Sequence, residues 1–140
     1  MVAKLLLVDD DPVLLGLLAK LLRSSGHAVA EADSGAACLA RVASEKFDLI
    51  ITDVMMPDMD GYQLTRELRA GPASRDTAIL VVTAAVRGAD RDKSLAAGAD
   101  GYDMKTVNVG RLNQKIETIL AARQAGGADP AGVRRPGSPE

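Results

Sequence analysis

Aspartates end two of the short apolar runs in this 140-residue chain. Asp9 and Asp10 follow the run 4–8, and Asp53 follows the run 49–52. If these runs are neighbouring strands, three carboxylates crowd together and repel one another by about 1 to 4 kcal/mol per pair. A bound cation would relieve this repulsion. An all-oxygen site without His or Cys suits a hard ion such as Mg2+.

Two further polar side chains, Thr83 and Lys105, also follow apolar runs and add a hydroxyl and an ammonium group. Carboxylates, a divalent cation, an ammonium and a hydroxyl are together typical of a phosphoryl-transfer site. Carboxylates can also accept a phosphoryl group covalently. Asp53 is the predicted acceptor because it stands alone at its strand end, whereas Asp9 and Asp10 are placed to hold the metal together.

The segments that must position these groups alternate between continuous apolar runs, typical of buried strands, and stretches of helical periodicity. Strands are predicted at residues 4–8, 28–31, 49–52, 79–82 and 101–103, each followed by a helix, with N-caps at Asp11, Ser34 and Asp60. The alternation predicts an α/β fold: a flavodoxin-like, doubly wound, five-stranded parallel sheet of order 2-1-3-4-5 with helices on both faces. In that order the first and third strands are neighbours, which brings the three aspartates to one edge.

Composition favours a single soluble domain, with 47% hydrophobic and 26% charged residues. One cysteine, Cys38, and one histidine, His27, exclude a disulfide framework or a Cys/His metal site and fit a reducing compartment. A net charge of -2 and 2% aromatic residues argue against nucleic-acid binding. Neither a signal peptide nor a membrane span is predicted, so we expect a cytoplasmic protein.

The composition changes near the end of the chain. Residues 124–140 hold four Gly and three Pro, and Val133 is their single bulky apolar residue. We therefore predict an ordered domain over residues 1–123 and a disordered Gly- and Pro-rich tail over residues 124–140.

Several motifs of the chain follow one another in an order and spacing that mark a known family. They are Leu7-Val8-Asp9-Asp10, the run from Asp53 to Gly61, Val82-Thr83-Ala84, the run from Gly98 to Tyr102, and Lys105. Over residues 3–120 the chain resembles the response-regulator receiver domain (CheY-like), the phosphoacceptor part of bacterial two-component signalling.

The resemblance implies a phosphoacceptor site. Asp53 would accept a phosphoryl group from a histidine kinase or a histidine phosphotransfer protein. Asp9, Asp10, Asp53 and the backbone carbonyl of Met55 would hold Mg2+, Asp9 through water, and Lys105 would pair with a phosphoryl oxygen. The domain would catalyse its own phosphorylation and dephosphorylation and would not be an enzyme for external substrates.

The resemblance also implies a switch. Thr83 would bond the phosphoryl group and Tyr102 would turn inward behind it, which remodels the surface of the fourth helix, fifth strand and fifth helix. That surface would control binding of a downstream effector protein or a phosphorylation-dependent dimer, with no direct contact to nucleic acid or membrane.

One position departs from the family pattern. Thr106 follows Lys105, where the family has proline joined by a cis bond. A cis bond before a residue other than proline costs about 2.5 to 4 kcal/mol, so the loop is either trans or strained. Met55 and Ala85 also offer no side chain that could position a hydrolytic water, which predicts slow loss of the phosphoryl group.

Two other functions are compatible with the same residues. The first is a receiver-like interaction module that works without phosphorylation; the missing proline slightly favours it, and the intact set of acids and Thr83 argue against it. The second is a Mg2+-dependent phosphohydrolase that uses Asp53. The absence of a second general acid near Asp53 in the sequence argues against the second.

Overall fold

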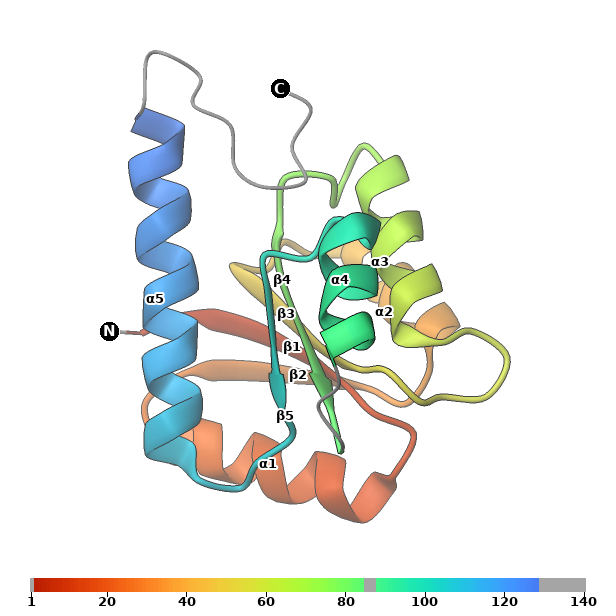
Figure 1. Ribbon diagram of the computed structural model, residues 1–140. Helices are drawn as coiled ribbons and strands as arrows, with labels where there is room; N and C mark the ends of the chain where they lie inside the picture. Colours follow the sequence, from red (N-terminus) through yellow and green to blue (C-terminus); the bar gives the residue numbers. More distant parts are fainter. Residues whose placement is uncertain (1, 85–87, 129–140) are drawn as a thin grey trace.

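The computed structural model describes residues 2–84 and 88–128, and strands and helices alternate along the chain (Figure 1). The strands are β1 (Lys4–Val8), β2 (Ala28–Ala32), β3 (Leu49–Asp53), β4 (Ala78–Thr83) and β5 (Gly101–Met104). The helices are α1 (Pro12–Ser24), α2 (Gly35–Ser44), α3 (Gly61–Ala70), α4 (Gly88–Ala97) and α5 (Val109–Ala128). Every predicted strand and helix is present, with small differences at the ends.

The strands form one parallel sheet of order β2-β1-β3-β4-β5, which confirms the predicted topology. Val8 of β1 lies opposite Thr52 of β3, and Asp53 lies opposite Val82 of β4. Thr83 is in turn level with Met104 of β5. The register therefore brings the carboxyl ends of β1, β3, β4 and β5 to one edge, where ligands bind in sheets of this kind.

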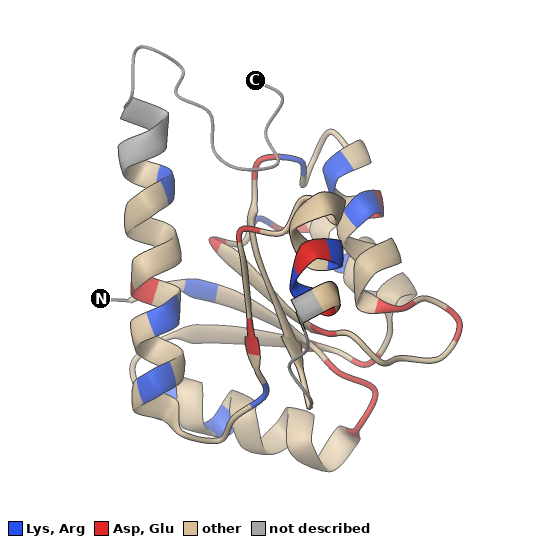
Figure 2. Cartoon of the chain, viewed as in Figure 1, with Lys and Arg blue, Asp and Glu red and all other residues tan. Residues whose placement is uncertain are grey.

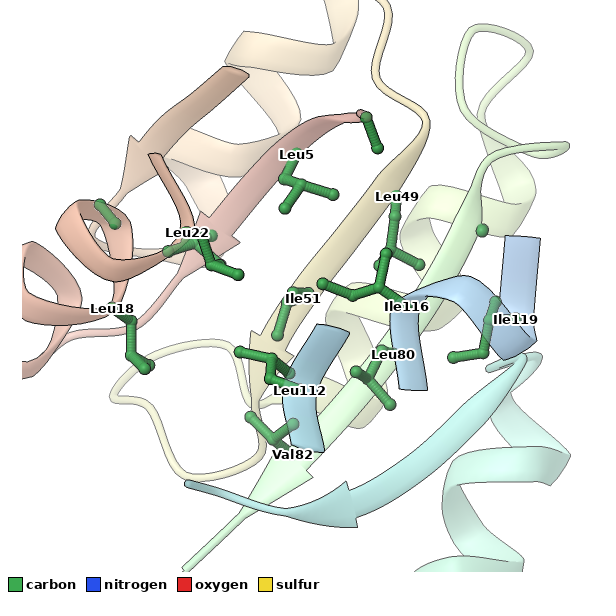
Figure 3. Close-up of a cluster of buried hydrophobic side chains, with 14 of the residues drawn as sticks. Leu5, Leu18, Leu22, Leu49, Ile51, Leu80, Val82, Leu112, Ile116 and Ile119 are labelled. Carbon is green, nitrogen blue, oxygen red and sulfur yellow. The ribbon is translucent and has the colours of Figure 1, made fainter. Parts of the chain in front are cut away.

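Helices cover both faces of the sheet, so its central strands are apolar at successive positions. Leu5 and Leu7 of β1 belong to the cluster packed against α1 and α5, which Figure 3 shows with Leu18, Leu22, Ile116 and others. Leu6 and Val8 point to the opposite cluster, to which α2 and α3 contribute. Helix α4 lies beside α3 and contacts β5 (Figure 1). The two clusters fix the strands that carry the candidate site.

Side-chain caps determine where three of the helices begin. Asp11 accepts hydrogen bonds from the backbone N–H groups of Val13 and Leu14, at 3.0 and 3.2 Å. Ser34 accepts from the N–H of Ala37 at 3.0 Å and Asp60 from that of Gln63 at 2.8 Å, which confirms the predicted N-caps of α2 and α3. Each cap satisfies N–H groups that the first helical turn leaves without partners.

The last helix runs past the predicted domain boundary at residue 123. The structure describes the backbone of α5 as helical to Ala128, and the division into a domain and a tail stays a prediction. Gly126 and Gly127 each disfavour a helix by about 1 kcal/mol, but extending an existing helix needs no new nucleation. The rest of the predicted tail, residues 129–140, lies outside the described residues, and its disorder stays a prediction.

Candidate functional site

The three predicted aspartates meet at the carboxyl edge of the sheet. Asp9 and Asp53 are buried, with 4% and 6% of their surface exposed, while Asp10 is exposed. One carboxylate oxygen from each lies within 4.8 Å of the other two. Figure 2 shows the acidic loop between β1 and α1 at this edge. The predicted juxtaposition of residues far apart in the sequence is therefore present in the fold.

Lys105 lies between the two buried acids. Its Nζ is 2.9 Å from Oδ2 of Asp9 and 2.9 Å from Oδ2 of Asp53. The backbone N–H of Lys105 donates to the carbonyl of Thr83 at 2.7 Å, which ties the residue to the end of β4. No cis peptide bond occurs among the described residues, so the bond to Thr106 is trans. The lysine therefore reaches the acids without the proline that the family has next to it.

The remaining oxygens of the buried acids accept backbone hydrogen bonds. Oδ1 of Asp53 accepts from the N–H of Val54 at 2.8 Å, and Oδ1 of Asp9 accepts from the N–H of Asp11 at 2.9 Å. Each carboxylate is therefore held from both sides, by a backbone amide on one oxygen and by Lys105 on the other. This arrangement fixes the orientation of the Asp53 carboxylate before any ligand arrives.

The charges at the site act on one another. Burial raises the pKa of Asp53 above its usual value, and the negative charge of Asp9 adds to the rise; the hydrogen bond and charge of Lys105 and the amide of Val54 oppose it. Burial disfavours the ammonium form of Lys105, but its hydrogen bonds to Asp9 and Asp53 outweigh this and raise its pKa. The lysine thus stays charged and partly neutralises the acid pair.

The donor set fits a hard divalent cation. All the candidate ligand atoms are carboxylate oxygens, and the exposed Asp10 leaves the cluster open to water on one side. Mg2+ prefers a few protein oxygens together with several waters. Met55, whose carbonyl is the predicted fourth ligand, follows in the loop after β3 with 74% of its surface exposed. Its part in metal binding stays a prediction.

Thr83 and Tyr102, the predicted switch residues, lie on the neighbouring strands. Thr83 ends β4 and is buried with 6% exposure. Tyr102 of β5 is level with Val81, and its ring belongs to the apolar cluster on the α2 and α3 face. Ala85, the other residue predicted to affect hydrolysis, lies outside the described residues.

Sequence reasoning missed how closely the helix after the acceptor loop approaches the site. The N–H of Gly61 donates to the carbonyl of Val54 at 2.8 Å, and a Cβ at Gly61 would lie 2.3 Å from the carbonyl oxygen of Asp53. Real Cβ atoms do not come so near to a backbone oxygen. The signal in the sequence was the glycine just inside a predicted N-cap, where a side chain is otherwise tolerated.

Comparison with known proteins agrees with this geometry. The model of the response regulator receiver domain family matches residues 5–117. The chemotaxis protein CheY of Pseudomonas aeruginosa is 36% identical over 118 residues, which cover 84% of this chain and 95% of CheY. The solved structure of a CheY-like receiver domain protein from Methanospirillum hungatei has a TM-score of 0.80 at 30% identity and covers 89% of this chain and 98% of that one. The chain belongs to the response-regulator receiver family.

The chain also matches part of a longer relative. The gliding motility regulatory protein of Myxococcus xanthus is 36% identical over 117 residues, which are 83% of this chain but 15% of that protein. Receiver domains interact with histidine kinases and effectors, typically bind Mg2+ at an acidic pocket, and are generally not enzymes in their own right. None of the described helices has the length and apolar composition that a membrane span requires.

Proposed function

We propose that this domain is a phosphorylation-controlled switch of a two-component pathway, with Asp53 as the acceptor of the phosphoryl group. The observation that carries the proposal is the convergence of Asp9, Asp10 and Asp53 within 4.8 Å, with Lys105 bonded to two of them. The phosphodonor would be a histidine kinase or a histidine phosphotransfer protein. The location would be cytoplasmic, where such donors act.

The residues of the chain divide the work of the transfer. An oxygen of Asp53 forms the bond to phosphorus while the bond from phosphorus to the donor nitrogen breaks. The amide of Val54 keeps the carboxylate oriented, which reduces the entropy lost on reaching the reactive geometry. Lys105 supplies a fixed positive charge for a phosphoryl oxygen. Mg2+, held by Asp9, Asp10, Asp53 and the carbonyl of Met55, would neutralise further charge on the transferred group.

The output would come from a change in α4, β5 and α5. Thr83 ends β4 close to the acids, and Tyr102 lies on β5 next to that strand. A hydrogen bond between the Thr83 hydroxyl and the phosphoryl group would bias the position of α4 and Tyr102. The changed surface would bind an effector protein or a second phosphorylated copy.

Acetyl phosphate with Mg2+, followed by intact-mass spectrometry, tests the proposal. We expect one added phosphoryl group, absent without Mg2+ and absent in Asp53→Asn. Asp92→Asn, which removes an exposed carboxylate of α4, is the matched control and should be modified like the unchanged chain. An unmodified mass would instead support the interaction module that works without phosphorylation, and sustained release of phosphate would support a phosphohydrolase.

A further inference from the structure

Three residues that carry hydroxyl groups lie on the packed elements α3, α4 and β5. They are Tyr62 in the first turn of α3, Ser94 of α4 and Tyr102 of β5. Tyr62 packs against the apolar cluster that contains the Tyr102 ring. Figure 1 shows α3 and α4 side by side, and the two helices are in contact. None of the roles assigned above uses Tyr62 or Ser94.

The Tyr102 hydroxyl is buried and has no hydrogen-bond partner among the described residues. Only 9% of the Tyr102 surface is exposed. A buried hydroxyl without a partner costs free energy because it has given up its bonds to water. A motion that supplies a partner for this hydroxyl would therefore gain the free energy of the unmade bond.

Tyr62, which packs against the same apolar cluster as Tyr102, carries a hydroxyl that could become that partner. It donates to the backbone carbonyl of Asp90 in α4 at 3.5 Å, a distance at the upper limit for a hydrogen bond. The same carbonyl already accepts the Ser94 hydroxyl at 2.9 Å. Burial raises the pKa of Tyr62 to about 12, and the charges of Asp90 and Tyr102 add to the rise.

Helix α4 is weakly anchored by apolar contacts. Ser94 and Ala97 are its buried side chains among those described, and Arg91, Asp92 and Lys93 are exposed. A helix whose buried face consists of a serine and an alanine gains little from the hydrophobic effect. Leu95 is half-buried, and polar contacts such as the long bond from Tyr62 to Asp90 add to the small apolar contribution.

We propose that Tyr62 is a second tyrosine of the switch, whose hydroxyl leaves the Asp90 carbonyl and pairs with the buried Tyr102 hydroxyl when α4 moves. The inference rests on the proposed function, because phosphorylation of Asp53 supplies the motion of α4. The exchange replaces one long hydrogen bond by a good one and gives the unpartnered hydroxyl a partner, while Ser94 continues to satisfy the carbonyl. Tyr62 is thus a positioning residue that stabilises the active arrangement.

Beryllofluoride, a phosphoryl mimic, tests this pairing in the presence of Mg2+. A ligand that binds the active arrangement binds more weakly when that arrangement loses a hydrogen bond. We expect Tyr62→Phe to weaken beryllofluoride binding about fivefold, the effect of one net hydrogen bond. Tyr102→Phe should have the same effect, and the double variant should bind no more weakly than either single variant, because both substitutions remove the same bond. Ser44→Ala removes an exposed hydroxyl bonded to a helix carbonyl and should change nothing.

A second measurement does not depend on the binding affinities of the variants. The chain has two tyrosines, so 3-fluorotyrosine labelling gives two 19F resonances, which each single variant assigns. Both should shift on adding beryllofluoride to the unchanged sequence. Unaltered or tighter binding in Tyr62→Phe, additive losses in the double variant, or a shift of the Tyr102 resonance alone would overturn the pairing while leaving phosphorylation intact. An unchanged chain that does not respond to beryllofluoride at all would overturn the pairing and the proposed function together.

Discussion

Replacing Lys105 with methionine should destabilise the domain strongly when metal is chelated and only slightly when Mg2+ is present. Lys105 makes two ion pairs of 2.9 Å with Asp9 and Asp53. At an effective dielectric constant of 20, each attraction is about 6 kcal/mol, most of which the desolvation of the three groups offsets. Removing one partner of a buried pair typically costs about 3 to 5 kcal/mol, because the other charge is left uncompensated.

The expected loss for Lys105→Met is smaller than that range, about 2 to 3 kcal/mol in the free energy of unfolding. The lysine side chain keeps 16% of its surface exposed, so water partly compensates the two carboxylates. Bound Mg2+ would replace the missing positive charge and reduce the loss to below about 1 kcal/mol.

Urea unfolding followed by circular dichroism, with chelator and with Mg2+, measures both values. Lys20→Met, which removes an exposed ammonium of α1, is the control and should change stability by less than about 0.5 kcal/mol in either condition. Equal losses for Lys105→Met with and without Mg2+ would refute the view that the lysine and the metal neutralise the same acids.

Four further outcomes are expected. Gly61→Ala should destabilise the domain by about 1 to 3 kcal/mol in urea unfolding and slow its modification by acetyl phosphate, because the added Cβ would lie 2.3 Å from the Asp53 carbonyl oxygen. The control Gly16→Ala, which has open space around it, should leave stability unchanged or raise it slightly. Because burial raises the pKa of Asp53, its protonated form favours folding below its ordinary pKa of 3.8, and this contribution is lost as the pH rises through the raised value. Asp53→Asn should remove this pH-dependent loss of stability and, at pH 7 in chelator, should be more stable than the unchanged chain. If the free energy of unfolding of Asp53→Asn depends on pH as that of the unchanged chain does, the burial argument is contradicted. Asp100→Asn should lower the free energy of unfolding by about 2 to 3 kcal/mol, because Asp100 forms ion pairs with Arg69 at 2.8 Å and Arg123 at 2.7 Å. A loss no larger than that for substitution of an exposed aspartate would show that these two ion pairs add nothing to stability. The phosphorylated form should lose its phosphoryl group slowly, as followed by intact mass over time; fast loss that Met55→Ala lowers would show that Met55 promotes hydrolysis.

Most of the fold could be predicted because its signals are local. The runs that became β1, β3 and β4 are largely apolar at successive positions, and this pattern is typical of strands that are covered on both faces. Right-handed crossovers then leave few ways to order parallel strands joined by helices. The convergence of Asp9, Asp10 and Asp53 follows from that order alone, since the carboxyl ends of parallel strands lie at one edge.

The end of α5 could not be predicted from the sequence, because composition indicates flexibility without indicating where a helix stops. Glycines and prolines after residue 123 pointed to disorder, yet the backbone remains helical to Ala128. Each added residue of an existing helix is decided by a balance of about 1 kcal/mol or less, which composition averaged over 17 residues cannot resolve.

The sequence by itself determined which chemical groups stand at the ends of the strands, because hydrophobic periodicity and strand order are properties of the chain read in one dimension. Only the tertiary structure decided that the Lys105 side chain pairs with both buried acids. It also decided that the bond from Lys105 to Thr106 is trans and that the Tyr102 hydroxyl is buried without a partner among the described residues. It also showed His27 buried, with Nδ1 accepting from the N–H of Ala3 at 3.0 Å. Such contacts depend on side-chain rotamers and on the angles at which helices pack, which combine many weak interactions across the whole core.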